Sequence, residues 1–456
     1  FLLFLLFLLL LLTQRDTMRI CLHGRPRPKQ PRLLHFCFCL LGLVAICPER
    51  QWLRSSGFLV AGAAGCARLE LATGARAAPE SVGRGAWPHK SIQRRAAEGS
   101  AAAGGDDGSD IPRRLTLGVG LSLLAAVGAK RFLIDGPPEF DPAPRSLQGR
   151  TVLITGANTG LGKESAIRLA RAGATVVITA RTDEKGLQAL EAIKAASSAS
   201  DVHFLQLDLA DLANVRSFRQ RFQSQSYGEK LDVLLNNAGV MAIPERRQTK
   251  DGFEQQFGVN HLGHFTLVAQ MLPLLKKATG FARVINVSST AHLGATKENM
   301  EGDLMAPERY TQWGAYCQSK LANVLFAKEL DRRFKQAGVK ATAVACHPGG
   351  VDTDLARWLV VNSEDAAAAK KARKENAAFE AIGTFLTRDV QHGANTQVYL
   401  AAGADGGYDR SGGGYFDNMA PGLLNPVADD EALAKQLWTE SERLTGTKLD
   451  VSSAAA

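Results

Sequence analysis

Residues 151–173 read TVLITGANTGLGKESAIRLARAG, an apolar run of strand length that passes through a glycine-rich turn into an amphipathic helix. Gly156, Gly160 and Gly162 let the backbone turn tightly and approach a ligand, and the helix points the positive end of its dipole at the turn. This combination suits the pyrophosphate of a dinucleotide. Glycine-rich turns also occur in ordinary loops, but the place of this one between a buried strand and a helix favours the dinucleotide interpretation.

The chain after Gly149 repeats the same alternation of strand and helix. Most of the expected strands are continuous apolar runs, as in strands buried on both faces. Repeated β-α units predict right-handed crossovers and a parallel sheet covered by helices on both sides, with ligands at the carboxyl ends of the strands. We therefore predict an α/β fold with a doubly wound parallel (Rossmann) sheet, forming a single catalytic domain over residues 149–450. The expected strands are Thr151–Thr155, Thr175–Thr179, His203–Leu207, Val233–Asn236, Arg283–Val287 and Ala341–Ala345.

The segment before this domain has a different composition. Residues 1–110 carry 14 Lys and Arg against 8 Asp and Glu, so most of the net charge of +9 lies there, as do five of the seven cysteines. The folded part is therefore not expected to hold a zinc site or a disulfide framework, or to bind nucleic acid. We expect residues 1–110 to be a disordered leader. A basic stretch and an apolar run over 33–47 resemble a secretory signal, and residues 48–105 resemble a transit peptide. That order is typical of plastid import, and an untidy low-complexity leader is the alternative.

A second apolar segment, residues 115–129, has two basic residues on each side. Fifteen uncharged residues are marginal for a bilayer span, although flanking Arg and Lys side chains extend the reach. We expect region 111–148 to be an apolar membrane anchor followed by a stiff proline-rich linker, with a helix docked on the domain as the alternative. The protein is thus predicted to be membrane-associated, in a plastid or the endoplasmic reticulum.

The end of the second expected strand indicates which dinucleotide is preferred. A carboxylate at this point would bind the ribose 2′-hydroxyl of NAD and repel a 2′-phosphate. The chain instead has Ala180 followed by Arg181, whose planar guanidinium suits a phosphate. NADP(H) is therefore the expected cofactor, and a solvated surface arginine is the alternative.

Tyr316 and Lys320 are four residues apart in a helical run, so both side chains lie on one helix face. A phenol with a pKa near 10 is a poor acid-base catalyst at neutral pH, but a nearby ammonium lowers that pKa. A serine hydroxyl bonded to the substrate oxygen would stabilise the charge that develops there. Such a Tyr/Lys pair is usually a pair of solvent-exposed side chains, but its position after a dinucleotide-binding turn favours a catalytic pair.

These motifs in this order resemble the short-chain dehydrogenase/reductase family. The resemblance covers about 300 residues and rests on TGANTGLG at 155–162, NNAG at 236–239, VNHLGHF at 259–265, Ser288-Ser289, YCQSK at 316–320 and HPGGVDT at 347–353. It implies that Tyr316 is the catalytic acid/base, that Lys320 lowers its pKa and holds the nicotinamide ribose, and that Ser289 rather than Ser288 assists. It also implies that Asn260 holds a water that joins Lys320 to solvent.

The resemblance further implies the residues that bind the cofactor. The glycine turn would hold the phosphates, Asp208 the adenine, Asn237 the adenosine side, and HPGGVDT the nicotinamide amide. The expected cofactor-binding residues are Gly156, Asn158, Thr159, Gly160, Leu161, Gly162, Arg181, Asp208, Leu209, Asn237, Ala238, Gly239, Tyr316, Lys320, Pro348, Gly349 and Thr353.

Finer features are similar to the retinol-dehydrogenase-like branch, whose members are typically membrane-associated and prefer NADP. The expected function is interconversion of a hydrophobic alcohol and its aldehyde or ketone. The alternatives are an NADP(H)-binding regulatory or scaffold protein and a protochlorophyllide-reductase-like enzyme. Residues 356–382 are expected to cover the substrate pocket, with Trp358 and Leu359 as apolar contacts, and Cys317 to be a spacer rather than a nucleophile. A homodimer is the possible assembly.

Overall fold

The computed structural model describes residues 134–302, 304–305, 308–351, 387–404 and 411–452. The expected leader, the apolar segment 115–129 and the substrate-covering segment 356–382 lie outside these ranges. Among the described residues, no helix has the length and apolar character needed to cross a bilayer.

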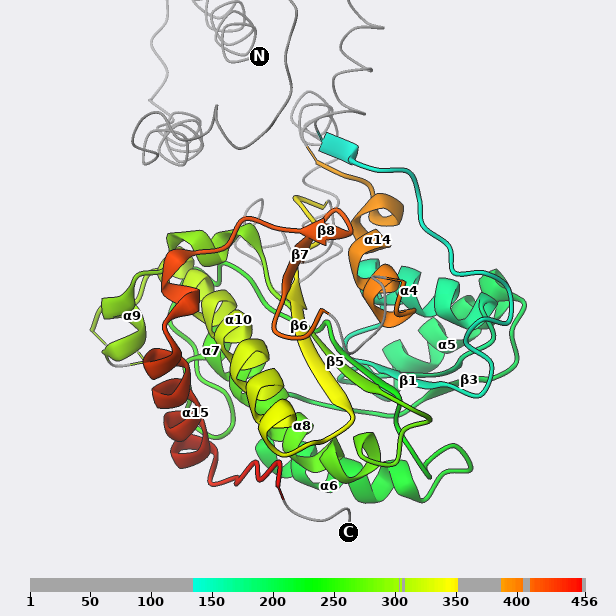
Figure 1. Cartoon of the computed structure of the whole chain (residues 1–456), viewed down its shortest axis with the longest axis horizontal. Coiled ribbons are helices and arrows are strands. Elements are labelled where there is room, and N and C mark those ends of the chain that lie inside the picture. The colour runs from blue at the N-terminus through cyan, green and yellow to red at the C-terminus, as the bar shows by residue number, and fades with distance from the viewer. Residues whose placement is uncertain (1–133, 303, 306–307, 352–386, 405–410, 453–456) are drawn as a thin grey trace, which may run out of the picture. The chain divides into compact units, whose positions relative to one another are not determined.

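The described chain forms one sheet with the order β3-β2-β1-β4-β5-β6-β7-β8 (Figure 1). Every neighbouring pair is parallel except β7 and β8. The order turns back between β1 and β4, which is where a doubly wound sheet opens a crevice at its carboxyl edge. The strands are β1 (Thr151–Ile154), β2 (Thr175–Ile178), β3 (Val202–Phe204), β4 (Val233–Asn236), β5 (Ala282–Val287), β6 (Ala341–Cys346), β7 (Tyr415–Asp417) and β8 (Ala420–Pro421).

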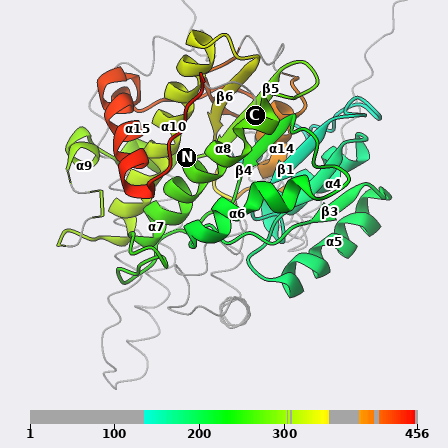
Figure 2. The same cartoon turned by 90° about the horizontal axis from the view of Figure 1, so that it is seen from below.

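Helices cover both faces of this sheet, as the continuous apolar strands require. The helices α4 (Gly160–Arg171), α5 (Asp183–Ser197) and α14 (Val390–Ala401) pack on one face. The helices α6 (Leu212–Gln223), α8 (Gly263–Leu275), α10 (Gln312–Gln336) and α15 (Glu431–Thr445) pack on the other, and the layers can be followed in Figure 2. The short elements are α7 (Gln255–Phe257), η2 (Gly258–Leu262), η3 (Thr290–Gly294), α9 (Lys297–Glu301) and η5 (Pro426–Asp429).

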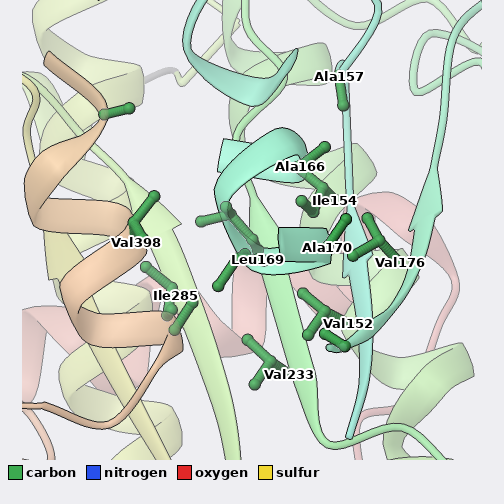
Figure 3. Close-up of a cluster of buried hydrophobic side chains, with 14 of the residues drawn as sticks. Val152, Ile154, Ala157, Ala166, Leu169, Ala170, Val176, Val233, Ile285 and Val398 are labelled. Atoms are coloured by element: carbon green, nitrogen blue, oxygen red, sulfur yellow. The ribbon is translucent and has the colours of Figure 1, made fainter. Parts of the chain in front are cut away.

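Alternate residues of the central strands supply the two cores. Val152 and Ile154 face α4 and α14, where they join Ala166, Leu169 and Val398 (Figure 3). Leu153, between them, faces the opposite layer. All the strand residues named are fully buried. The predicted doubly wound parallel sheet is confirmed, and all six expected strands are present: Val233–Asn236 has the predicted ends, and the ends of the other five differ by at most three residues.

Two features were not expected. The edge is extended by β7, which pairs in parallel with β6, and by the antiparallel β8. Between α7 and α8 the helix widens into the π-helical turn η2, which contains Asn260. Such turns are rare and often occur at functional sites.

The segment 134–148 is packed on the domain rather than free. Arg388 donates a hydrogen bond from Nε to the carbonyl of Ile134 (2.9 Å), and Arg168 donates from Nη1 to that of Phe140 (3.1 Å). Asn395 donates to the carbonyl of Pro138 (2.9 Å). The expected stiff linker is thus held by polar side chains of α4 and α14 and by Arg388.

Candidate active site

The glycine turn after β1 has the conformation that the sequence requires. Gly156 and Gly160 have φ of 63° and 54°, a region that side chains disfavour. A Cβ at Gly162 would lie 2.5 Å from Nδ2 of Asn237 and 2.8 Å from the carbonyl of Gly156. The turn therefore tolerates no side chain at Gly162.

A cleft of about 610 Å³ opens at this turn. The first residues of α4 line this cleft, and Thr159 provides no side-chain cap for their N–H groups. A helix N-terminus of this kind can bind an anion. Of the expected cofactor-binding residues, twelve line this one cleft. They are Gly156, Asn158, Thr159, Gly160, Leu161, Gly162, Arg181, Asp208, Leu209, Asn237, Ala238 and Gly239.

The charged wall of the cleft is mainly cationic. Arg181 lies there with an exposed side chain, and Lys163 and Lys185 join it. The carboxylate of Asp208 accepts a hydrogen bond from the backbone N–H of Ala210 (2.9 Å), which holds its loop. Lys185 was missed from the sequence, because a lysine in the first turn of a helix carries no distinguishing signal.

The structure brings Tyr316, Lys320 and Ser289 together. Tyr316 and Lys320 are buried on one face of α10, with the Lys320 Nζ 5.6 Å from the centroid of the Tyr316 ring. Lys320 Nζ also donates to the carbonyl of Val287 (3.0 Å), at the end of β5. Ser289 hydrogen-bonds the Tyr316 phenol, whereas the Ser288 hydroxyl donates to the carbonyl of Lys320 (2.7 Å). Ser289 is therefore the serine that contacts the Tyr316 phenol, and Ser288 links the end of β5 to α10.

Burial dominates the electrostatics of these groups. It raises the pKa of the Tyr316 phenol above its usual value, while the Ser289 hydrogen bond lowers that pKa. Burial also lowers the pKa of Lys320 to about 8. Burial raises the pKa of Cys317 to about 11, so this thiol is protonated and unreactive at neutral pH.

The side chain of Asn260 is held by the backbone of Val240 and the hydroxyl of Ser319. Its Oδ1 accepts from the N–H of Val240 (2.8 Å), and its Nδ2 donates to the carbonyl of Val240 (2.9 Å) and to Ser319 Oγ (3.0 Å). Gly239 is close to both Asn260 and Lys320: a Cβ on Gly239 would lie 3.3 Å from Asn260 Oδ1 and 3.6 Å from Lys320 Nζ. The side chain of Asn260 is thus used structurally, within a few ångströms of the Lys320 ammonium.

The turn after β6 is partly described. Gly349 has φ of 84°, and a Cβ there would lie 2.8 Å from Cζ of Arg388. Arg388 also donates from Nη1 to the carbonyl of Pro348 (3.1 Å). Thr353, Trp358 and Leu359 lie outside the described residues. Pro348 and Gly349 do not line the glycine-turn cleft.

The fold and the site define a class of protein. Residues 150–364 match the family described as short chain dehydrogenase, and the chain belongs to the short-chain dehydrogenase/reductase family, whose members bind nicotinamide cofactors.

Among its relatives, retinol dehydrogenase 13 of Homo sapiens is 39% identical over 322 residues, covering 71% of this chain and 91% of the relative. Polyprenol dehydrogenase of Mus musculus is 37% identical over 336 residues, covering 72% and 92%. A crystal structure of an uncharacterised protein from Mycobacterium paratuberculosis superposes with a TM-score of 0.51 at 36% identity, covering 69% of this chain and all of the other. These relatives place the chain in the retinol-dehydrogenase-like branch.

Proposed function

We propose that this oxidoreductase uses NADP(H) to interconvert a hydrophobic alcohol and its aldehyde or ketone. The observation that carries the proposal is the meeting of Tyr316, Lys320 and Ser289 at the carboxyl edge of a sheet with a glycine turn built for a dinucleotide. The crowded Gly162 position and the uncapped start of α4 fit a pyrophosphate.

Three side chains have separate roles in the transfer of the proton to the substrate oxygen. When bound, the nicotinamide supplies or accepts the hydride. Burial raises the pKa of Tyr316, where the sequence predicted a lowered one; the phenol is protonated at neutral pH but is a weaker acid, and the Ser289 hydrogen bond acts in the opposite direction. Tyr316 is the group that can give a proton to the oxygen of a carbonyl. The Ser289 hydroxyl donates a hydrogen bond to that oxygen, and the Lys320 ammonium stabilises the tyrosinate left behind. Reversal of these steps returns the proton in the oxidative direction.

The cationic wall supports the choice of NADP(H). Arg181 and Lys185 line the cleft beyond β2, where a 2′-phosphate on the adenosine ribose would meet them. Ala180 occupies the preceding position, is buried and carries no charge. A 2′-phosphate would therefore meet cations and no competing carboxylate at the end of β2.

Exposed apolar side chains beside the catalytic group support a hydrophobic substrate. Trp313, 40% exposed, lies edge-on to the Tyr316 ring with centroids 6.1 Å apart. Leu293, 38% exposed, lies in η3 directly after Ser289. Large apolar groups left in water beside a reaction centre are typical of a site for an apolar ligand. Two relatives are named as dehydrogenases of apolar alcohols, retinol and polyprenol.

The apolar segment 115–129 remains the proposed anchor, which would bring this site to a lipid-dissolved substrate. Its location in the endoplasmic reticulum or a plastid, and pairing into a homodimer, are part of the same proposal. Imaging of the tagged full-length chain and carbonate extraction of its membranes test the anchor. A chain that lacks residues 115–129 should then leave the membrane fraction.

The activity is tested by following NADPH oxidation with residues 134–456 and a panel of retinal, apocarotenals and fatty aldehydes. We expect turnover of at least one aldehyde, and Tyr316→Phe should abolish it while NADPH binding changes little. Normal turnover by Tyr316→Phe would contradict the acid-base assignment. NADPH binding without consumption of any carbonyl would favour the regulatory or scaffold alternative.

A further inference from the structure

Two buried histidines contact the backbone of the catalytic residues. Nδ1 of His292 lies 2.6 Å from the carbonyl oxygen of Ser289, and Nδ1 of His264 lies 3.0 Å from that of Asn260. A carbonyl oxygen only accepts, so Nδ1 carries the proton in both rings. Each imidazole is thus a donor that holds the main chain at a residue of the site.

The second nitrogen of His292 fixes its protonation state. The backbone N–H of Asn425 donates to Nε2 of His292 (3.2 Å), and a backbone N–H cannot accept. Nε2 must therefore be unprotonated. Nδ2 of Asn425 also donates to the carbonyl of His292 (2.8 Å). Asn425, directly before η5, thus holds both the ring and the backbone of His292. Only the neutral Nδ1–H tautomer satisfies every contact.

The same tautomer follows for His264 from a different neighbour. Its Nε2 lies 2.9 Å from Thr155 Oγ1, which already accepts from the N–H groups of Asn237 (2.9 Å) and Ala238 (3.0 Å). With both lone pairs in use, Thr155 Oγ1 cannot accept from His264, so Nε2 of His264 accepts from the hydroxyl, for which the carbonyl of Leu235 (3.4 Å) is the more distant acceptor. His264 thereby joins the turn after β4 to the π-helical turn that holds Asn260.

Charge and burial favour the neutral rings. Burial lowers the pKa of both His264 and His292 to about 4. Neighbouring basic groups act in the same direction: Lys320 lowers the pKa of His264, and His347 lowers that of His292. His261, the other ionisable group beside His264, is also buried and has a pKa of about 3. The Tyr415 ring covers His292, with ring centroids 4.6 Å apart.

We propose that His264 and His292 are positioning residues that, as neutral Nδ1–H imidazoles, hold the main chain of Asn260 and Ser289 in the catalytic arrangement. The kinetic part of this inference rests on the proposed function. Neither ring reaches the reacting atoms, so the effect is on geometry, where a displacement of about 1 Å is enough to cost on the order of 100-fold in rate.

Kinetics of matched variants test the proposal. His292→Phe keeps a ring but removes both hydrogen bonds, and we expect kcat for the best aldehyde to fall about 10- to 100-fold with the NADPH Kd within about threefold. His292→Asn keeps a donor near the Nδ1 position and should recover most of kcat. His264→Phe should lower kcat similarly and also weaken NADPH binding, because it frees Thr155.

His261→Phe is the matched control. His261 lies in η2 beside Asn260, but its ring contacts Ser441 Oγ (2.8 Å) on α15 instead of the main chain of a catalytic residue. Its replacement should lower the unfolding temperature and leave kcat within about twofold. A folded His292→Phe enzyme with wild-type kcat, or one no slower than His261→Phe, would overturn the proposal for His292, and the same comparison decides His264.

A second measurement needs no substrate and no variant that might fail to fold. Long-range ¹⁵N–¹H spectra of the histidine-labelled wild-type domain report which ring nitrogen carries the proton. We expect Nδ1–H signals for two buried rings that stay unchanged from pH 7.5 to pH 5. An Nε2–H tautomer at His264 or His292, or titration of either ring near pH 6.5, would refute the hydrogen-bond assignment even if the aldehyde panel had failed.

Discussion

Asn237 donates two hydrogen bonds to Thr155 across the carboxyl ends of β1 and β4. The Asn237 N–H donates to Thr155 Oγ1 and the Asn237 Nδ2 donates to the Thr155 carbonyl, each at 2.9 Å. The pair lies directly beneath the glycine turn, since Nδ2 is the atom that a Cβ on Gly162 would strike. The cofactor cleft therefore depends on a hydroxyl that faces away from it.

Thr155→Val should weaken NADPH binding about 10-fold and lower stability. The fully buried hydroxyl accepts from two backbone N–H groups. That of Asn237 also reaches the carbonyl of Leu235 (3.0 Å), but that of Ala238 would be left unpaired, which costs about 1–3 kcal/mol. Thr155→Ser keeps the hydroxyl and should stay within about twofold of the wild-type Kd. Fluorescence titration of NADPH and urea unfolding measure the two effects, and equal values for the Val and Ser variants would contradict this role.

Arg181→Glu should reverse the cofactor preference. The new carboxylate would repel a 2′-phosphate and accept a hydrogen bond from the 2′-hydroxyl of NADH. We expect the NADPH Kd to rise at least 10-fold, with the NADH Kd unchanged or lower. Lys185→Met should produce a smaller change in the same direction. Arg443→Glu, an exposed charge reversal on α15, serves as the control. An unaltered ratio of the two Kd values would show that Arg181 is only a surface residue.

Stability should fall between pH 6.5 and pH 5. His261, His264 and His292 have folded-state pKa values of about 3, 4 and 4, below the unfolded value near 6.5. The unfolded state therefore binds more protons in this window, so their contribution is full above pH 6.5 and is lost progressively as the pH falls toward 4. Each ring should lose about 2 kcal/mol by pH 5.

Urea unfolding at pH 7.5, 6 and 5 measures this slope. Carboxylates with lowered pKa values titrate mainly below pH 5, so the window isolates the histidines. A stability that does not change from pH 7.5 to pH 5 would contradict the buried neutral rings.

A domain that begins at residue 149 should be less stable than one that begins at residue 134. The shorter chain loses the Arg388–Ile134 and Arg168–Phe140 hydrogen bonds and the buried Leu147. Arg168 is 1% exposed, so part of a buried guanidinium would lose its acceptors. We expect the unfolding temperature to fall by at least about 5 °C.

Charge neutralisation in the same segment provides the control. Glu139→Gln and Asp141→Asn change side chains that lie 3.7 and 3.6 Å from Arg168 but are about half exposed, and exposed ion pairs contribute little. These variants should unfold within about 1 °C of the parent. If the two chain lengths unfold at the same temperature, segment 134–148 is a passive linker.

The sheet and the glycine turn could be predicted because their signals are local. A continuous apolar run such as Val233–Asn236 can be buried in only a few ways, and the tight backbone at Gly156 requires glycine. Tyr316 and Lys320 were found because helical spacing alone places them together. Each of these inferences used residues that are neighbours in the sequence.

The features that were missed depend on contacts between distant segments. The three-residue strand β7 is too short to carry a periodic signal and forms because β6 leaves a free edge. The π-helical turn around Asn260 depends on packing that helical periodicity does not reveal. His292 acquires its role only through Asn425, which is 133 residues further along the chain.

The wide turn η2 places one residue more than a regular helix would need between α7 and α8. An α-helix advances by about 100° for each residue. Deleting a single residue from Gly258–Leu262 would therefore let the turn close into a regular helix, with residues inside it turned by about that angle while the flanking helices keep their places. The amide that bridges Val240 and Ser319 would swing out of register, while the apolar stripe of α8 could remain seated on the sheet. A one-residue deletion that preserves the fold would thus remove Asn260 from its position beside the candidate active site.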